Sequence, residues 1–302
     1  MKGAFVFLSA SVPDPKRHRR FLDGPLDDAL MLRVIDRRVD HAVQSLLSQT
    51  LSAGGRIVHG GHPKITMPIA HQANQWKVPP GIEPPIRIYQ SEFFRHHEAP
   101  LGRDEMARSG TGEVHWIPAD LNLIVTKRQI PLDLVERHLP QQAPPDAKPG
   151  QHEALLAMRI EMIIDSQPIS AICIGGMEGI EAEARLYLEL AKLGRIPSAD
   201  HVQVIGSTYG ASAQLQGEGI RLADQELMQP PTGFEPHLLG GFGVSGPLIE
   251  GDDEGDFTEP VGPKAKPTLR STPETAKQDL QNRIPYDGIM RSLVARIAST
   301  HS

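Results

Sequence analysis

Three glycines within five residues could hold a phosphate group. Gly175, Gly176 and Gly179 follow the apolar run 171–174 and lead into a stretch with helical periodicity from Ile180. Because glycine has no Cβ, a phosphate can approach the backbone closely there, and the free N–H groups of the following helix supply donors and a positive dipole end. The alternative is an ordinary strand-to-helix turn, for which one glycine would suffice. The spacing therefore favours a phosphate site.

A second junction of this kind lies earlier in the chain. Gly60 and Gly61 follow a short strand predicted at 56–59, and a helix is predicted from 63 to 73, where Pro63 presets φ for a helix start. Glycines at this junction again allow a ligand close to the backbone. Two such junctions in one chain favour an anion site more strongly than either does alone.

Small polar and basic side chains beside these junctions could contact the same ligand. Lys64 could add a positive charge, and His62 could act as a hydrogen-bond donor or simply cap the turn. Ser9 and Ser11 follow an apolar strand predicted at 4–8, at the end where open α/β sheets bind ligands. The two hydroxyls could donate to a phosphate or a ribose, or merely cap a turn.

Arg159 stands in a predicted helix, 152–166, whose apolar residues cover most of its circumference. The arginine can extend its charge along apolar surface toward water, or it can aim at an anion. After the predicted strand 201–206, residues 207–210 form a third candidate ligand loop.

These residues must be positioned by strands and helices that alternate along the chain. Long or terminal helices are also predicted at 28–51 and 285–297, and strands are predicted at 4–8, 56–59, 86–89, 121–125, 171–174 and 201–206. The order predicts an α/β fold, a Rossmann-like parallel sheet with helices on both faces, plus an irregular C-terminal extension. We expect a nucleotide-binding domain at 1–227, a Pro/Gly/acid-rich extension at 228–283 and a docking helix at 284–302.

Composition narrows the function classes. The 302 residues carry a formal net charge of −6, and only 5% are aromatic, which argues against the basic, base-stacking groove of a nucleic-acid binder. The single cysteine, Cys173, excludes an internal disulfide framework and suits a reducing cytosol. No run approaches the roughly 20 apolar residues of a membrane span. We expect a soluble, cytoplasmic protein.

A metal site is not expected. His96 and His97 are adjacent, but neighbours in sequence rarely point the same way, and no cysteine or carboxylate stands at ligand spacing from them. We interpret this region as a loop near the ligand, and we expect no cofactor.

The arrangement resembles the SLOG superfamily, which joins the DprA-type DNA-binding proteins and the lysine-decarboxylase-like LOG proteins. LOG proteins carry an Arg-Lys pair before a Pro-Gly-Gly-x-Gly-Thr-x-x-Glu motif. Here Arg159 precedes Gly175 by 175 − 159 = 16 residues, the spacing of that family, and Glu183 follows Gly179 by four. The turn at 58–62 is similar to the glycine loop of the family's second strand. The resemblance covers about 5–223 and implies a Rossmann-like parallel sheet.

The sequence departs from the LOG motif at four positions. Ile174 stands for the proline, Ile160 for the lysine, and Ile180 for the threonine that binds phosphate, while Glu178 lengthens the loop by one residue. Isoleucine cannot hydrogen-bond a phosphate, and a displacement of about 1 Å can cost about 100-fold in rate. The departures therefore favour binding over catalysis.

The resemblance implies three alternative functions. Some SLOG branches sense nucleotide signals derived from NAD in prokaryotic anti-phage systems, which implies a sensor that binds an ADP-ribose-like ligand through the glycine loops, Ser9, Ser11, Lys64 and Arg159. LOG enzymes hydrolyse the N-glycosidic bond of nucleoside monophosphates, which implies a phosphoribohydrolase with Arg159 and Glu183 as the catalytic pair. A DprA-like protein would bind single-stranded DNA.

The resemblance also implies partners. LOG proteins are commonly homodimers or larger assemblies, so a homo-oligomer is expected. Any effector of a sensor would be a separate chain. The expected ligand is a nucleotide-derived small molecule, and neither a membrane nor a nucleic acid is an expected partner.

Overall fold

The computed structural model describes residues 1–12, 29–76, 83–95, 101–140, 147–197, 202–205, 208, 210–215 and 286–300. These residues contain one six-stranded sheet in which every neighbouring pair is parallel. In spatial order its strands are β4 (Gly112–Ile117), β3 (Ile86–Ser91), β2 (Arg56–His59), β1 (Phe5–Ser11), β5 (Ser170–Gly175) and β6 (Val202–Ile205). The strand order reverses between β1 and β5. The predicted Rossmann-like parallel sheet is confirmed.

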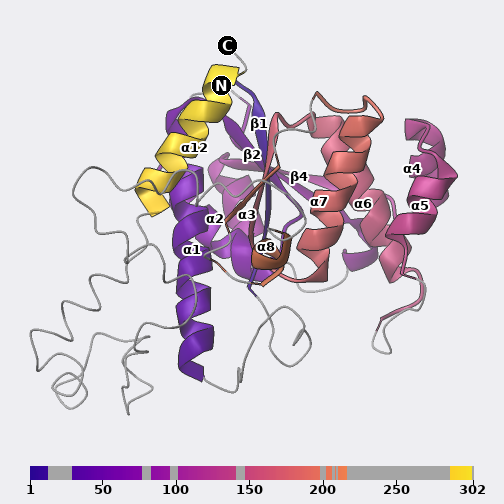
Figure 1. Cartoon of the computed structure of the whole chain (residues 1–302), viewed down its shortest axis with the longest axis horizontal. Helices are drawn as coiled ribbons and strands as arrows, with labels where there is room; N and C mark the ends of the chain where they lie inside the picture. The colour runs from indigo at the N-terminus through magenta and orange to yellow at the C-terminus, as the bar shows by residue number, and fades with distance from the viewer. Residues whose placement is uncertain are drawn as a thin grey trace, which may run out of the picture.

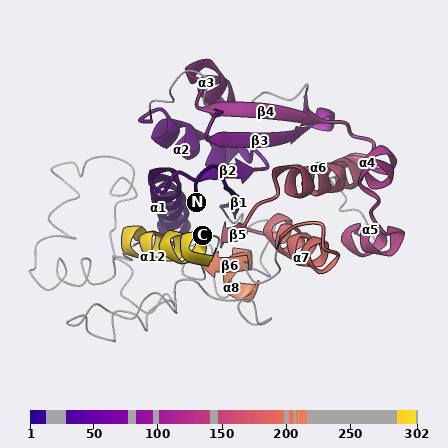
Figure 2. The same cartoon turned by 90° about the horizontal axis from the view of Figure 1, so that it is seen from above.

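Helices cover both faces of this sheet, as Figures 1 and 2 show. One face carries α1 (Ala29–Ser52), α2 (Pro63–Ala73), α3 (Leu101–Ser109) and α12 (Tyr286–Thr300). The other carries α6 (Gln151–Ser166) and α7 (Glu178–Lys192), with α4 (Leu121–Arg128) against α6 and α5 (Leu132–His138) against α7. Two short helices, η2 (Glu92–Phe94) and α8 (Gly210–Leu215), complete the described elements.

The core lies on both faces of the two central strands. All six residues of β5 are buried, and so are the apolar residues of β1 from Phe5 to Leu8. A parallel strand covered by helices on both sides must be apolar on both sides, which explains why these segments read as continuous apolar runs. Apolar residues of α1 pack against this core, with Ile35, Val39 and Leu46 fully buried.

The C-terminal helix α12 lies along α1, far away in sequence but adjacent in both views (Figures 1 and 2). Its apolar residues Met290 and Leu293 are fully buried. Ser45 on α1 donates a hydrogen bond to Asp287 Oδ1 at 2.6 Å, and Arg296 reaches Gln203 on β6 at 2.8 Å. The predicted terminal helix is therefore confirmed, whereas the extension at 228–283 lies outside the described residues.

One predicted strand is wrong. Residues 121–125 belong to the helix α4, because the Asp120 side chain accepts a hydrogen bond from the Leu123 N–H at its start and Gln129 ends it in a left-handed conformation. The fourth strand of the chain is instead β4, whose alternation of apolar and polar residues is weak. The helix cap at Asp120 outweighs the strand preference of the β-branched residues that follow it.

None of the helices in the described residues is both long enough and apolar enough to cross a membrane.

Candidate functional site

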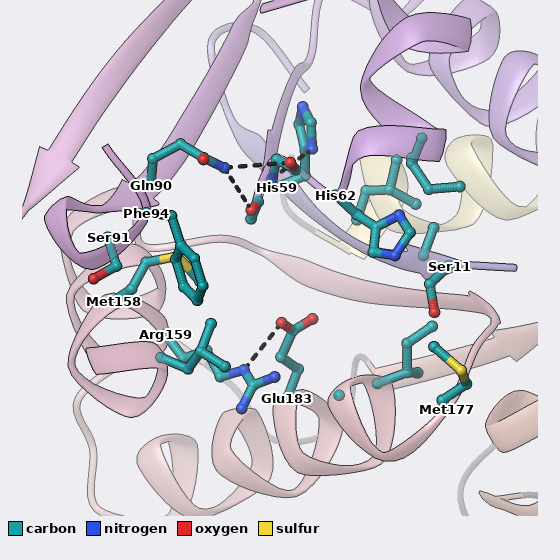
Figure 3. Close-up of a pocket in the computed structure, with 18 residues that line it drawn as sticks. Ser11, His59, His62, Gln90, Ser91, Phe94, Met158, Arg159, Met177 and Glu183 are labelled. Carbon is teal, nitrogen blue, oxygen red and sulfur yellow. Dashed lines mark hydrogen bonds and ion pairs between the residues drawn. The ribbon is translucent and has the colours of Figure 1, made fainter. Parts of the chain in front are cut away.

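A cavity of about 400 Å³ opens at the carboxyl ends of β1, β2 and β3, bounded by α6 and α7 (Figure 3). It lies close to the place where the strand order reverses, which is where open α/β sheets bind ligands. Its volume falls within the roughly 300–1,000 Å³ of small-molecule sites. Among the predicted site residues, the following line it: Ser11, Gly60, Gly61, His62, Arg159, Gly179 and Glu183.

Arg159 on α6 and Glu183 on α7 meet in this cavity, although 24 residues separate them. Arg159 Nε donates to Glu183 Oε1 at 3.2 Å, and the two side chains are 17% and 14% exposed. The guanidinium carries four further N–H donors beyond Nε–H. The pair can therefore present hydrogen-bond donors and a carboxylate acceptor to one ligand.

Ser9 holds the Glu183 carboxylate in place by a hydrogen bond. Its hydroxyl donates to Glu183 Oε2 at 2.5 Å, and the residue is only 1% exposed and does not line the cavity. Glu183 is thus held at one oxygen from β1 and at the other from α6. Ser9, predicted as a direct ligand contact, instead lies behind the carboxylate and fixes its position.

The glycine turn after β2 is braced by internal hydrogen bonds. The Gly61 N–H donates to His59 Nδ1 at 3.1 Å, and Gln90 Nε2 donates to the carbonyls of Gly60 and Gly61 at 3.0 and 3.3 Å. Gly61 has φ of +66°, and a Cβ there would lie 1.9 Å from Gln90 Nε2. Glycine is therefore required at 61 by this brace. The Gly61 N–H and both carbonyls are engaged within the protein.

His59 is a buried, neutral member of the same turn. Burial is the main cause that lowers the pKa of His59 to about 3, and the nearby His62 adds to the effect. Since Nδ1 accepts the Gly61 N–H, the ring proton is assigned to Nε2. That atom is buried without a hydrogen-bond partner among the described residues.

His62, Ser11 and Lys64 have different positions around the cavity. His62 lines it, and its Nδ1 is buried without a partner among the described residues. Burial, followed by the charge of Lys64, lowers the pKa of His62 below its ordinary value. Ser11 lines the cavity at the end of β1, whereas Lys64 is exposed and does not.

The glycine pair after β5 does not line the cavity. Gly175 and Gly176 have φ of +65° and +88°, and a Cβ on Gly176 would lie 2.0 Å from Ile180 Cδ1. The Gly175 N–H donates to Thr208 Oγ1 at 2.7 Å, and the Ala211 N–H donates to the Gly176 carbonyl at 2.9 Å. The positive φ at both positions and the close contact with Ile180 favour glycine here for reasons of packing, without any role for a ligand. Of the predicted trio, only Gly179 faces the ligand space.

Thr208 belongs to the third candidate ligand loop, 207–210. It is fully buried, links Gly175 to the Ile205 carbonyl, and does not line the cavity. Residues 207 and 209 lie outside the described residues.

Two helices begin at the cavity without a side-chain cap. His62 precedes α2 and Met177 precedes α7, and neither side chain bonds to the helix that follows. A helix start carries a positive dipole end, although Pro63, the first residue of α2, has no N–H to donate. Together with Arg159 the two helix starts make this wall of the cavity suited to an anion.

Sequence reasoning missed the residues that line the other end. Gln90 and Ser91 end β3, and Phe94 ends η2. Leu155 and Met158 line the cavity from α6, with Met158 near Arg159 (Figure 3). The rule used for Ser9 and Ser11, that ligands bind at the carboxyl ends of parallel strands, also applies to the end of β3 and could have identified Gln90 and Ser91.

Metal ligands were sought among the described residues. No group of three or more His, Cys, Asp or Glu there is placed to hold a metal ion. The adjacent pair His96 and His97 lies outside the described residues.

The sequence matches the model of a known protein family. The model of the SLOG cluster3 family matches residues 36–114 and 141–230, more than half of the chain, and these ranges contain Gly60, Arg159 and Glu183. Searches of curated proteins and of solved structures returned no match.

Proposed function

We propose that this chain, which belongs to the SLOG cluster3 family, binds a nucleotide or an NAD-derived, ADP-ribose-like ligand in the cavity between α6 and α7. The observation that carries the proposal is the Arg159–Glu183 pair in a cavity where two uncapped helices also begin. Guanidinium groups and helix starts both favour phosphate oxygens.

The cavity offers a different surface to each part of such a ligand. The anion wall, formed by Arg159 and the starts of α2 and α7, suits a phosphate. Glu183 can accept hydrogen bonds from sugar hydroxyls, because a carboxylate offers about four lone-pair sites and its two protein donors use only some of them. Phe94 and Met158 supply an apolar surface for a base (Figure 3).

The favoured role is that of a sensor, which binds its ligand and leaves it intact. The chain lacks the hydroxyl at Ile180 and the tight glycine loop with which LOG enzymes position phosphate. The loop that remains is tied to Thr208 and Ala211. A role in a prokaryotic defence system, with a separate effector chain, is the setting that we propose for this sensor.

A second candidate is hydrolysis of the N-glycosidic bond of a nucleoside 5′-monophosphate. The ion pair between Arg159 and Glu183 favours it, because a positioned carboxylate can orient water and stabilise oxocarbenium charge.

Thermal unfolding with a ligand panel tests both candidates. The panel contains AMP, IMP, CMP, ADP-ribose, NAD and cyclic ADP-ribose isomers. A ligand at about 100 times its Kd should stabilise by about 2.7 kcal/mol, which is a shift of several degrees for a domain of this size. Chromatography then shows whether each stabilising ligand stays intact.

Variants separate the outcomes. The sensor predicts stabilisation with the ligand intact, and the hydrolase predicts release of free base that Glu183→Gln abolishes. Glu181→Gln is the matched control, since Glu181 pairs with Arg185 on the same helix and does not line the cavity. If no phosphate-bearing ligand shifts the transition, the proposed function is contradicted.

A further inference from the structure

We infer that His62 recognises the anionic group of the ligand and takes up a proton when that group binds. The inference rests on the proposed function, since it concerns the same cavity. It adds a specificity-determining residue, and a dependence of binding on protonation, to a site otherwise described by Arg159 and Glu183.

The position of His62 supports this role. Its ring extends from the start of α2 toward the space between Glu183 and Ser11 (Figure 3). Nδ1 is buried and has no partner among the described residues. A buried polar atom without a partner costs free energy in the folded protein. Such an atom at the wall of a cavity is suited to a hydrogen-bond partner on the ligand.

Several neighbouring polar groups of the cavity already make hydrogen bonds within the protein. Glu183 accepts hydrogen bonds from Ser9 and Arg159. The Gly61 N–H donates to His59 Nδ1, and the Gln90 side-chain amide donates to the Gly60 carbonyl. His62 differs from these residues, because no hydrogen bond to its side chain is found among the described residues.

The surroundings of His62 favour the neutral ring in the free protein. The charged and titratable residues that line the cavity beside His62 are His59, Arg159 and Glu183, and Lys64 lies next to it on α2. The helices α1 and α3 pack against α2, and their charged and titratable groups include Asp36, Arg37, Arg38, Asp40 and His41 on α1 and Asp104, Glu105 and Arg108 on α3. After burial, Lys64 is the charge that lowers the pKa of His62, and the positive start of α2 acts in the same direction.

A bound phosphate reverses this balance. Its negative charge, placed near the ring, favours the imidazolium form. The pKa of His62 is therefore higher in the complex than in the free protein, and binding takes up a proton between the two values. Affinity for a phosphate-bearing ligand then falls as the pH rises through the pKa of the complex. A nucleoside without phosphate does not show this dependence.

Nuclear magnetic resonance of the histidine rings measures the proposed step directly in the full chain. The His62 signal is assigned by its loss in His62→Gln, and its titration is followed alone, with AMP, with ADP-ribose and with adenosine. AMP or ADP-ribose should raise the pKa of His62 by about one unit or more, and adenosine should not. His71 is an internal control, because it lies exposed on the same helix.

Binding measurements on the variants give an independent readout. A change of one pKa unit corresponds to a change in affinity of up to about tenfold, which is complete only where the ring is also protonated in the free protein. His62→Gln should therefore weaken AMP by up to about tenfold at acidic pH, and by less as the pH rises toward about 8. His71→Gln should not change the affinity. If AMP or ADP-ribose binds the wild type while the His62 titration stays unmoved, the inference about His62 is overturned and the proposed function stands. If neither ligand binds, both are overturned.

Discussion

At the scale of single residues, the site is organised around one carboxylate. Glu183 is held by Ser9 from the central strand β1 and by Arg159 from α6, so that its two oxygens are fixed from two different elements. Ser9 does not line the cavity and can act only through Glu183. A ligand that binds there meets an acceptor whose orientation is already set, which lowers the ordering cost of binding.

Replacement of Ser9 tests this support. Ser9→Ala removes one of the two donors to Glu183, and we expect AMP to bind about tenfold more weakly, since a hydrogen bond to a charged group is worth about 1.5–3 kcal/mol. Titration calorimetry of a double-mutant cycle is the measurement. In a Glu183→Gln background the same change should have little further effect. An equal loss in both backgrounds would refute the positioning role.

His59 makes stability depend on pH. Its pKa in the fold, about 3, lies below the unfolded value of 6.5, so the unfolded chain binds an extra proton between these values. The contribution is complete above pH 6.5 and is lost at about 1.4 kcal/mol per pH unit as the pH falls toward 3.

His59→Asn removes this titration while Asn can still accept the Gly61 N–H. Urea unfolding should therefore show that the destabilisation caused by His59→Asn is about 2 kcal/mol smaller at pH 5 than at pH 7.5. The same destabilisation at both pH values would contradict a buried neutral His59.

At the scale of elements, α6 is the helix that positions Arg159, and α4 holds it in place. Glu161 on α6 is 7% exposed and receives hydrogen bonds at 2.7 Å from Lys127 and from two nitrogens of Arg128. Burial alone would raise the pKa of Glu161, but these bonds outweigh it and hold the pKa below its usual value. The ion pairs of Glu161 with Lys127 and Arg128 therefore attach α6 to α4.

Glu161→Gln should destabilise the fold by about 2–3 kcal/mol at pH 7, because Arg128 loses its counter-charge in a partly buried place. The depressed pKa means that the stabilisation is present above about pH 4.5 and is lost as the pH falls further. Urea unfolding measures both effects. Asp133→Asn is the control, since its pair with Arg137 is exposed to solvent and should contribute little to stability. Equal effects of the two substitutions would contradict the account.

The elements also show what the sequence can and cannot predict. Buried strands such as β5 and the apolar stripe of α1 are local patterns, and they were predicted with nearly correct bounds. The apolar run at 121–125 was misassigned, because a cap at Asp120 competes with β-branched residues and only the folded context decides between them. The reason for a glycine is also not visible in the local sequence. Gly176 is required by Ile180 and Gly61 by Gln90, contacts that no local pattern contains.

At the scale of the whole molecule, the fold includes a helix from beyond the region that the SLOG family model matches. That region ends at residue 230, whereas α12 covers part of α1 with fully buried side chains. The core that supports the site therefore extends to the C-terminal helix.

Leu293→Ala should destabilise the protein by about 2–5 kcal/mol, the usual cost of a large-to-small change at a fully buried leucine. Arg291→Ala, at an exposed position on the same helix, should change stability by less than about 0.5 kcal/mol. Chemical unfolding of the full chain measures both. A negligible effect of Leu293→Ala would show that α12 is not part of the cooperative fold.

The proposed ligand binds inside the cavity, so a variant whose side chain fills the cavity should lose binding. A Cβ on Gly60 would lie 3.3 Å from Met158 Cε and 3.9 Å from Glu183 Oε1, so the side chain of Gly60→Met should enter the ligand space while all the polar groups remain. We would titrate AMP and ADP-ribose into the wild type and Gly60→Met by calorimetry, after confirming equal unfolding temperatures. The account predicts one-site binding by the wild type and its loss in the variant. Equal affinity in the two proteins, or no binding by the wild type, would contradict it.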